Sequence, residues 1–313
     1  MDSLRNELSD TEQIIIPMAH PDTSEFYQCM AAAILFNFCK NPLYREYPWH
    51  GLQTLRRIIV KENHQDDYTK IQLQLLIHIS KMNLKAHESA RYINNLEFIV
   101  IHEPEDDSSR AWLQLAYKTI SNDSVLGSID CLMENAFNVK VEDTNKREVG
   151  ASYIDLIKTE LRGFSGFDWV YINLGHFDAK RYKHRKSRDC DVLVALDVVT
   201  LVIHEYAHVR IRQALNDMNM STPTKVPKES LFEDMEFGRI VERHIFGAVP
   251  NWLNSYNRGT DSGQLLLEFA QAFITSIENN KKVPAVPLGL TLENRDATVA
   301  MGGADIQVER HIE

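Results

Sequence analysis

Apolar residues recur every three or four positions over much of the first 90 residues, which is the spacing of one face of an α-helix. Few glycines or prolines interrupt these stretches, and Pro42 and Pro48 bracket the connection that follows the first of them. Residues 1–90 are therefore predicted to form an N-terminal helical region. Its predicted helices are Glu25–Lys40, Gly51–Glu62 and Tyr68–Met82.

The pattern changes after residue 90, where short runs rich in β-branched and aromatic residues alternate with helical periodicity. The predicted strands are Leu96–His102, Phe137–Val141 and Trp169–Leu174. Helices are predicted near 110–120 and 151–161. Alternation of this kind favours a small mixed sheet covered by helices.

Helical periodicity returns after residue 190. The predicted helices of this part are 191–216, 231–246 and 262–280. The last thirty residues, 284–313, lose the periodicity, which predicts an extended C-terminal tail. The fold class that follows is α+β and predominantly helical, with a core domain at 91–283 between the N-terminal helical region and the tail.

The composition is typical of a globular protein, with 44% hydrophobic and 25% charged residues. The 34 basic and 44 acidic residues give a net charge of −10, which argues against nucleic acid as a partner because phosphate backbones are bound by excess positive charge. Four cysteines without C-x-x-C spacing indicate a reducing compartment. We find no signal-peptide pattern and no stretch of the roughly 20 apolar residues that a membrane span needs, so we expect a cytoplasmic protein without membrane contact.

The segment Leu201–Arg210, LVIHEYAHVR, contains the motif H-E-x-x-H. His204 and His208 are four residues apart, so on a helix their rings lie about 40° apart around the axis and can bind one metal ion. Glu205 flanks the same site and is placed to act as a general base toward a metal-bound water. Because the surrounding residues are apolar, burying these three side chains without a metal would be costly. The pattern therefore predicts a metal centre.

A third protein ligand is expected from the acidic segment that follows, because catalytic zinc sites use three. Ser230 and Glu233 form a predicted capping box, which gives Glu233 a structural role. Glu236 lies one turn further on, and Gly238 would let this helix approach the histidine helix closely. Glu242 is the competing candidate, six residues beyond Glu236. We therefore expect Glu236 as the third ligand, with Glu242 and Glu233 as alternatives.

HEYAH at 204–208, followed by Glu236 in MEFGRIVE, resembles the gluzincin branch of the zinc metallopeptidases. The match is partial, because the Asn and Gly of that branch's N-E-G pattern are out of place and no G-A-M-E-N motif is present. The resemblance implies a zincin-like core domain in which Zn²⁺ is held by His204, His208 and Glu236. It also implies that Glu205 is the catalytic base.

Two further parts of a hydrolytic site are predicted from their position along the chain. In zincin folds a strand before the motif helix lines the cleft and pairs with an extended substrate, and Trp169–Leu174 occupies that place in order. The alternative is that this strand lies in the interior of the sheet. A donor is also needed for the developing oxyanion, and His244 and Tyr256 are the favoured candidates, with Arg243 as a third.

Six basic residues lie within the nine-residue segment 180–188, KRYKHRKSR, of an otherwise acidic chain. The simpler interpretation is a solvated loop. The alternative is that this basic segment overhangs the cleft and recruits an acidic substrate.

The sequence thus predicts a zinc-dependent hydrolase whose substrate is a peptide or protein. Two other functions remain open, namely a zinc-stabilised binding or scaffold protein without turnover, and a hydrolase of a non-peptide amide or ester. A purely structural zinc site would have no use for the base Glu205 and usually closes its fourth position with protein. The peptidase is therefore the favoured hypothesis.

Overall fold

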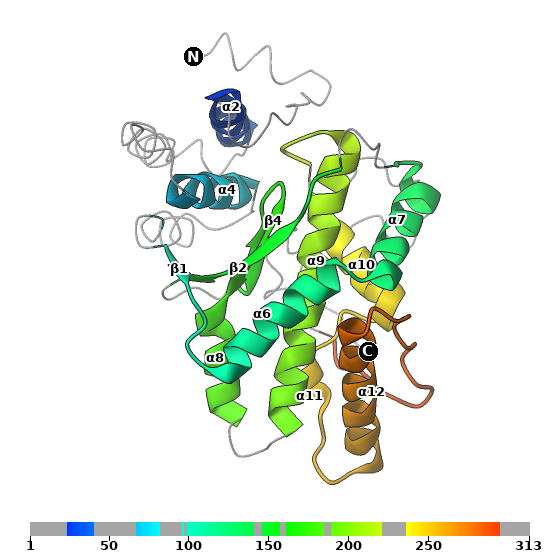
Figure 1. Cartoon of the computed structure of the whole chain (residues 1–313). Helices are drawn as coiled ribbons and strands as arrows, with labels where there is room; N and C mark the ends of the chain where they lie inside the picture. Colours follow the sequence, from blue (N-terminus) through cyan, green and yellow to red (C-terminus); the bar gives the residue numbers. More distant parts are fainter. Residues whose placement is uncertain are drawn as a thin grey trace, which may run out of the picture.

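The structure is a computed structural model of the chain, and helices make up most of what it describes (Figure 1). It describes residues 24–40, 67–81, 96, 99–140, 146–156, 161–184, 189–220 and 236–294. Its helices are α2 (Ser24–Lys40), α4 (Asp67–Lys81), α6 (Asp107–Ile120), α7 (Asp123–Phe137), α8 (Leu174–His184), α9 (Asp189–Leu215), α10 (Phe237–Phe246), α11 (Trp252–Ser255) and α12 (Asp261–Glu278). Its strands are β1 (Val100–His102), β2 (Gly150–Asp155), β3 (Gly163–Ser165) and β4 (Trp169–Asn173). The predicted α+β class, mostly helical with a small mixed sheet, is confirmed.

The four strands form one sheet in the order β1-β2-β4-β3. β2 and β4 run parallel, and β1 and β3 join them as antiparallel neighbours. Of the two places considered for Trp169–Leu174, the interior of the sheet is confirmed and the cleft-lining edge is wrong, because β4 is hydrogen-bonded to a strand on both sides. β3 lies at the end of the sheet instead, and within the described residues it pairs with β4 alone.

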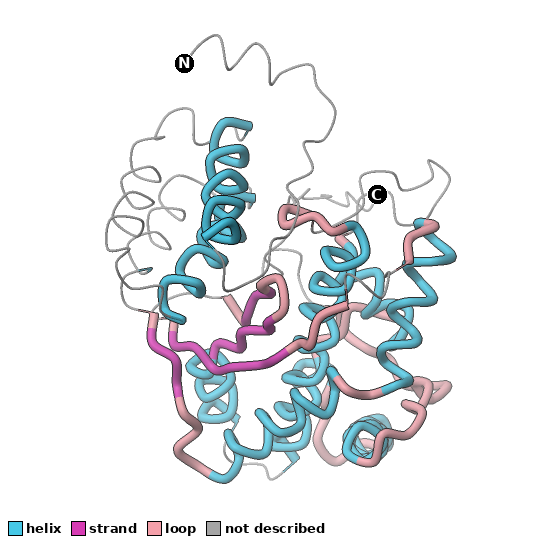
Figure 2. The backbone as a smooth tube through the Cα atoms, turned by 45° about the horizontal axis from the view of Figure 1, so that its top comes forward, coloured by secondary structure: helices cyan, strands magenta, loops and turns pink. Residues whose placement is uncertain are grey.

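The sheet is the middle one of three layers (Figures 1 and 2). Val170 and Ile172 of β4 belong to the core that contains α9, whereas Tyr171 belongs to a second core shared with α2 and α4. This alternation follows from the two-residue period of a strand, which sends successive side chains to opposite faces. The N-terminal helices therefore cover one face of the sheet, and α9 packs against the other.

Helix α9 runs through the centre of the larger core and carries the H-E-x-x-H motif. It contacts β3 and β4 as well as α6, α8, α10 and α12, so it is buried over most of its 27 residues and apolar on nearly every side. The expectation that no stretch is long and apolar enough to span a membrane does not hold for α9, which passes both criteria, but 89% of its most apolar stretch is buried inside the protein. Thr200, a buried polar residue of α9, is hydrogen-bonded, because its Oγ1 accepts a hydrogen bond from the indole N–H of Trp252 at 2.8 Å.

Most helices predicted from periodicity are confirmed. They are the predicted helices Glu25–Lys40, Tyr68–Met82, 110–120, 191–216 and 262–280. The predicted helix 231–246 begins later than expected, at Phe237, because Glu236 is extended and forms the N-cap instead of lying one turn inside the helix. Residues 231–235 lie outside the described part of the chain. The predicted helix 51–62 and the tail beyond residue 294 also lie outside it.

The predicted strand Phe137–Val141 is wrong, because the chain forms α7 up to Phe137 and residues 138–140 form no strand. Asn122 begins α7 by accepting hydrogen bonds from two backbone amides of its first turn. Asn138 ends it in the left-handed conformation, with φ of 54°, which Asn tolerates better than most residues. These two caps set the ends of α7, and its buried Val125, Ile129 and Met133 recur every four residues along one face.

The predicted helix 151–161 is also wrong, because residues 150–155 form β2. The segment ASYIDLI has apolar residues at spacings that suit a helix as well as a strand. β1 and β4 pair with it on its two sides and fix the extended conformation. Gly150 is required at its start, since a Cβ there would lie 2.5 Å from the Trp169 ring.

The first part of the basic segment is helical rather than a loop, because α8 extends to His184. Two of its cations are paired within the protein. Lys180 Nζ lies 2.7 Å from Asp197, and Arg181 lies 3.0 Å from Asp106 and 3.3 Å from Asp191. Residues 185–188 lie outside the described part of the chain. The basic side chains at 180 and 181 thus hold α8 in place.

A buried charge cluster ties α8 and the residue before β3 to the middle of α9. Asp197 accepts hydrogen bonds from Arg162 Nη2 at 2.5 Å and from Lys180 Nζ at 2.7 Å. Burial by itself raises the pKa of the Asp197 carboxyl, but the attraction of Arg162 and Lys180 outweighs this and lowers it. The ionised carboxylate therefore balances two cations in the interior.

We expect Asp197→Asn to lower the free energy of unfolding by about 3–5 kcal/mol, because it leaves buried cations without their anion. The pKa of Asp197 is lower in the folded than in the unfolded chain. The stabilisation is therefore complete above the unfolded value of about 4 and is lost as the pH falls through the folded value. Urea unfolding of both proteins near neutral pH and near pH ~3 measures this. Asp191→Asn, at an exposed carboxylate paired with Arg181, is the control and should cost less than about 1 kcal/mol. Equal losses in the two variants would contradict the interpretation.

Candidate metal centre

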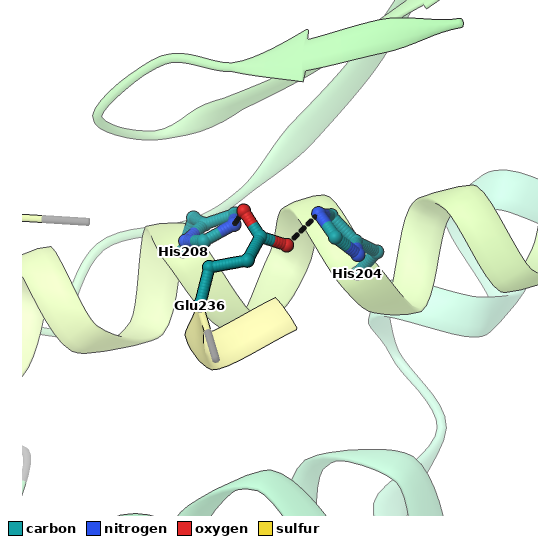
Figure 3. A group of neighbouring side chains, drawn as sticks. All are labelled: His204, His208 and Glu236. Carbon is teal, nitrogen blue, oxygen red and sulfur yellow. Dashed lines mark ion pairs between the residues drawn. The ribbon is translucent and has the colours of Figure 1, made fainter. Parts of the chain in front are cut away.

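The two histidines of the motif lie on one side of α9, and their rings are close together (Figure 3). The ring centroids of His204 and His208 are 5.1 Å apart. Both side chains are buried, with residue exposures of 6% and 5%. The four-residue spacing predicted that the two imidazoles lie on one face of a helix, and this prediction is confirmed.

Glu236 is the residue that brings a carboxylate to both rings. It occupies the N-cap position of α10 in an extended conformation, so its side chain reaches back across α9. Glu236 Oε1 lies 2.7 Å from His204 Nε2, and Oε2 lies 3.4 Å from His208 Nε2. Among the described residues, these three side chains are the group whose ligand atoms all lie within 4.8 Å of one another and could hold a metal ion.

These distances suit a small divalent cation. Two ligand atoms at about 2.1 Å from a tetrahedral zinc ion are about 3.4 Å apart. The separation of Glu236 from His208 equals this value, and the 2.7 Å contact with His204 would open by roughly 0.7 Å. Two imidazole nitrogens and one carboxylate oxygen form a ligand set that is found in catalytic zinc sites.

Glu242 lies on the far side of the same imidazole. Its Oε1 is 2.7 Å from His204 Nδ1, and the side chain is fully buried. A carboxylate in this position fixes the ring orientation and the tautomer, leaving Nε2 available to a metal. The geometry therefore favours Glu236 over Glu242 as the third ligand. Glu236 faces the Nε2 atoms of both histidines, whereas Glu242 contacts Nδ1 on the opposite side of the His204 ring. Glu233, the other alternative, lies outside the described residues.

Gly238 allows α10 to lie directly against His204. A Cβ at this position would lie 2.7 Å from three atoms of the His204 ring, closer than real Cβ atoms approach other groups. The close approach of the two helices that the glycine predicted is therefore confirmed. It lets Glu236 and Glu242, which lie on either side of Gly238 in sequence, contact the two nitrogens of one ring.

The centre concentrates negative charge in the core. Burial lowers the pKa of His204, but Glu236 and Glu242 outweigh burial and raise it well above its usual value. Burial likewise raises the pKa of Glu236, and His204 and His208 outweigh it and hold that pKa well below its usual range. The arrangement thus favours positive charge between the rings and the carboxylate, which a coordinated divalent cation supplies.

Glu205 lies beside the cluster and is only 4% exposed. Its Oε2 is buried and has no hydrogen-bond partner within the described residues. Burying a carboxylate oxygen without a hydrogen bond costs free energy unless a bound water or a substrate donates a hydrogen bond to it. This observation agrees with the predicted role of Glu205 as a base next to a metal-bound water.

The two predicted oxyanion donors do not reach the cluster. The Tyr256 hydroxyl donates to Asp189 at 2.6 Å, and Asp189 begins α9 about 22 Å along the axis from His204. His244 is exposed at the last turn of α10, about 12 Å along that helix from Glu236. Both predictions are therefore wrong. Their closeness to the motif along the chain did not show that tertiary packing places the two side chains away from the cluster.

Comparison with known proteins gives no match to a family model, to a curated protein or to a solved structure.

Gly238→Ala is expected to push α10 away from His204 and to weaken metal binding by about tenfold or more, the effect of losing a supporting contact at a metal ligand. Competition with a chromophoric chelator measures the affinity for Co²⁺ or Zn²⁺. Gly127→Ala in α7 is the matched control, because a Cβ there meets nothing within 4 Å and should leave the affinity unchanged. Unaltered metal affinity in Gly238→Ala would show that the close approach has no role in the centre.

Proposed function

We propose that this protein is a zinc-dependent hydrolase and that it cleaves peptide bonds. The observation that carries the proposal is the convergence of His204, His208 and Glu236 on one buried point, with the unpartnered oxygen of Glu205 beside it. A structural zinc site is usually closed by a fourth protein ligand and needs no base. The free carboxylate oxygen therefore favours a hydrolase over a zinc-stabilised scaffold.

In the proposed mechanism His204, His208 and Glu236 hold the metal, and Glu242 keeps the His204 ring in the binding orientation. Zinc in such a site polarises a substrate carbonyl and lowers the pKa of bound water to about 7. Glu205 Oε2 accepts the proton of the attacking water and then delivers it to the leaving amine. Burial of these groups excludes bulk water, which strengthens their electrostatic interactions with the substrate.

The choice of a peptide substrate is supported by β3. Arg162 O and Gly166 N–H bond to β4, at 2.9 and 2.7 Å, so the backbone groups of the alternate residues Gly163 and Ser165 point away from β4. Gly163 packs on Leu201, and Ser165 accepts a hydrogen bond from Arg212. β3 therefore runs along the stretch of α9 that contains the motif. Arg212 already occupies the outward carbonyl of Ser165, so an extended chain could pair with the outer edge of β3 at Gly163, for whose backbone groups no partner is described.

Glu205→Gln is expected to bind zinc with full stoichiometry and to lose at least about 100-fold in kcat, because the amide cannot accept the proton. Zinc content is measured by elemental analysis, and turnover with a mixture of quenched fluorescent peptides. Asp191→Asn, which changes an exposed carboxylate near the start of α9, is the control for the loss of one charge. Cleavage by Glu205→Gln at the wild-type rate would rule out this mechanism.

Glu242→Gln tests the support of His204. It removes the carboxylate at Nδ1 but retains the size of the side chain, so zinc affinity should fall by about 10–100-fold while the fold is maintained. Chelator competition gives the affinity, and far-ultraviolet circular dichroism checks the fold. An unchanged zinc affinity would show that Glu242 does not orient the ligand.

A further inference from the structure

Arg162 is a buried arginine whose guanidinium is only partly used by the fold. It directly precedes β3 and is 4% exposed. Its Nη2 donates to the backbone carbonyl of Asp197 at 3.1 Å and to the Asp197 carboxylate at 2.5 Å. Nε and Nη1 are buried too, and neither has a hydrogen-bond partner within the described residues. Because a guanidinium stays charged and all its nitrogens are donors, leaving these N–H groups unpaired costs free energy.

A second unpaired group lies next to Arg162. It is the imidazole of His176 on α8, the helix beside the first half of α9 (Figure 1). Its Nε2 is buried without a described hydrogen-bond partner, and the ring of the next residue, Phe177, lies 5.9 Å from the Arg162 guanidinium. Burial first, and then Lys180 and Arg162, lower the pKa of His176 to about 3 against the opposing effect of Asp197. The ring is therefore neutral near neutral pH, and Nε2 can carry a proton and donate it in a hydrogen bond.

These unpaired groups call for an acceptor, and the described carboxylates around them are already engaged. Asp197 binds both Arg162 and Lys180. Glu242, which Arg162 also attracts, contacts His204 Nδ1. A carboxylate from outside the chain suits the remaining donors, since arginine forms its strongest hydrogen bonds with carboxylate and phosphate oxygens.

Arg162 lies on the same face of α9 as the metal centre. Its partner Asp197 precedes His204 by seven residues, so the two are about 20° apart around the axis and about 10 Å apart along it. An extended chain covers this distance in about three residues. Gly163, where an extended substrate could pair with β3, follows Arg162 directly. A peptide paired there would have a residue opposite Arg162 two or three positions from the bond at the metal.

The unpaired nitrogens of Arg162 are closed to solvent, and so are the groups of the metal centre. Glu205 Oε2 is likewise buried and without a described partner. Under the proposed function, a substrate that reaches Glu205 has to enter between β3 and α9. Arg162 joins these two elements at the start of β3, so the same substrate would come within reach of its free N–H groups.

We propose that Arg162, with His176 beside it, binds a carboxylate group of the peptide substrate and thereby determines specificity. This site rests on the proposed function, because it requires a peptide held at the metal centre. Two groups supply the same chemistry. One is an acidic side chain two or three residues from the cleaved bond, and the other is the free C-terminal carboxylate of a short peptide.

The test uses the full-length, zinc-loaded chain and pairs of quenched fluorescent peptides. One set of pairs differs by Glu against Gln at a single position on either side of the cleaved bond, which mass spectrometry of the products locates. Another pair differs by a free against an amidated C-terminus. At constant ionic strength, kcat/KM should be about tenfold or more higher for the carboxylate member of one pair, and that pair identifies the source.

Three variants separate the free donors from the ion pair with Asp197. Arg162→Lys retains a cation for Asp197 but lacks Nε and Nη1, so the preference should fall below about threefold. His176→Phe leaves the ion pairs of Asp197 in place and should reduce the preference in part. Lys180→Met is the matched control, because it removes the other cation bound to Asp197 and should retain the full preference. Circular dichroism checks that each variant is folded.

Equal cleavage of both members of every pair by the wild type would overturn the proposal, and so would an undiminished preference in Arg162→Lys. Either result leaves peptide hydrolysis, and with it the proposed function, intact. If no peptide is cleaved, the proposed function fails, and fluorescence anisotropy of labelled Glu and Gln peptides tests the site separately. Tighter binding of the Glu peptide that Arg162→Lys abolishes would support a carboxylate site, and equal binding would reject it.

Discussion

The contact between Gly238 and the His204 ring is the constraint on which the metal centre depends. Without a Cβ, α10 lies directly on the imidazole, and the two acids on either side of the glycine contact Nε2 and Nδ1 of the same ring. One short helix thus provides both the third candidate ligand and the group that orients the first. A larger side chain would separate both carboxylates from His204 at once, so the two functions cannot be varied independently.

Most of the charges buried along α9 have a partner of opposite charge. Asp197 is neutralised by Arg162 and Lys180 two turns before the motif. Arg210 after the motif pairs with Asp130 at 2.8 Å. Between them lie Glu205 of the motif and the carboxylates of Glu236 and Glu242 from α10, and the proposed cation would complete the balance. A helix this apolar can carry so many ionisable groups because each neighbouring layer supplies an opposite charge or a carbonyl.

The sequence predicted what depends on spacing within one element. The four-residue interval of His204 and His208 specifies one helix face, and a glycine inside an acidic helix indicates a close packing contact, which led to Glu236. Residues whose place depends on tertiary packing were not predictable in this way. Tyr256 follows a short helix that packs near the start of α9, and β4 is interior because β3 folds back outside it. β2 shows another limit of the sequence. Its apolar pattern fits both a helix and a strand, and only its pairing with β1 and β4 makes it a strand.

The position of α4 links the N-terminal helices to the chemistry of the core. The cluster side chains are each less than a tenth exposed, so under the proposed function a substrate has to approach along a narrow path. β3 suits such a path, because backbone pairing holds an extended chain without demanding wide pockets. At the end of β3 the path meets side chains from α4 and the last turns of α9, among them Lys81 and Arg212. Under the proposed function, side chains of a helix far from the motif in sequence would therefore lie at one end of the site, and substrate preference would depend on the N-terminal region as well as on the motif.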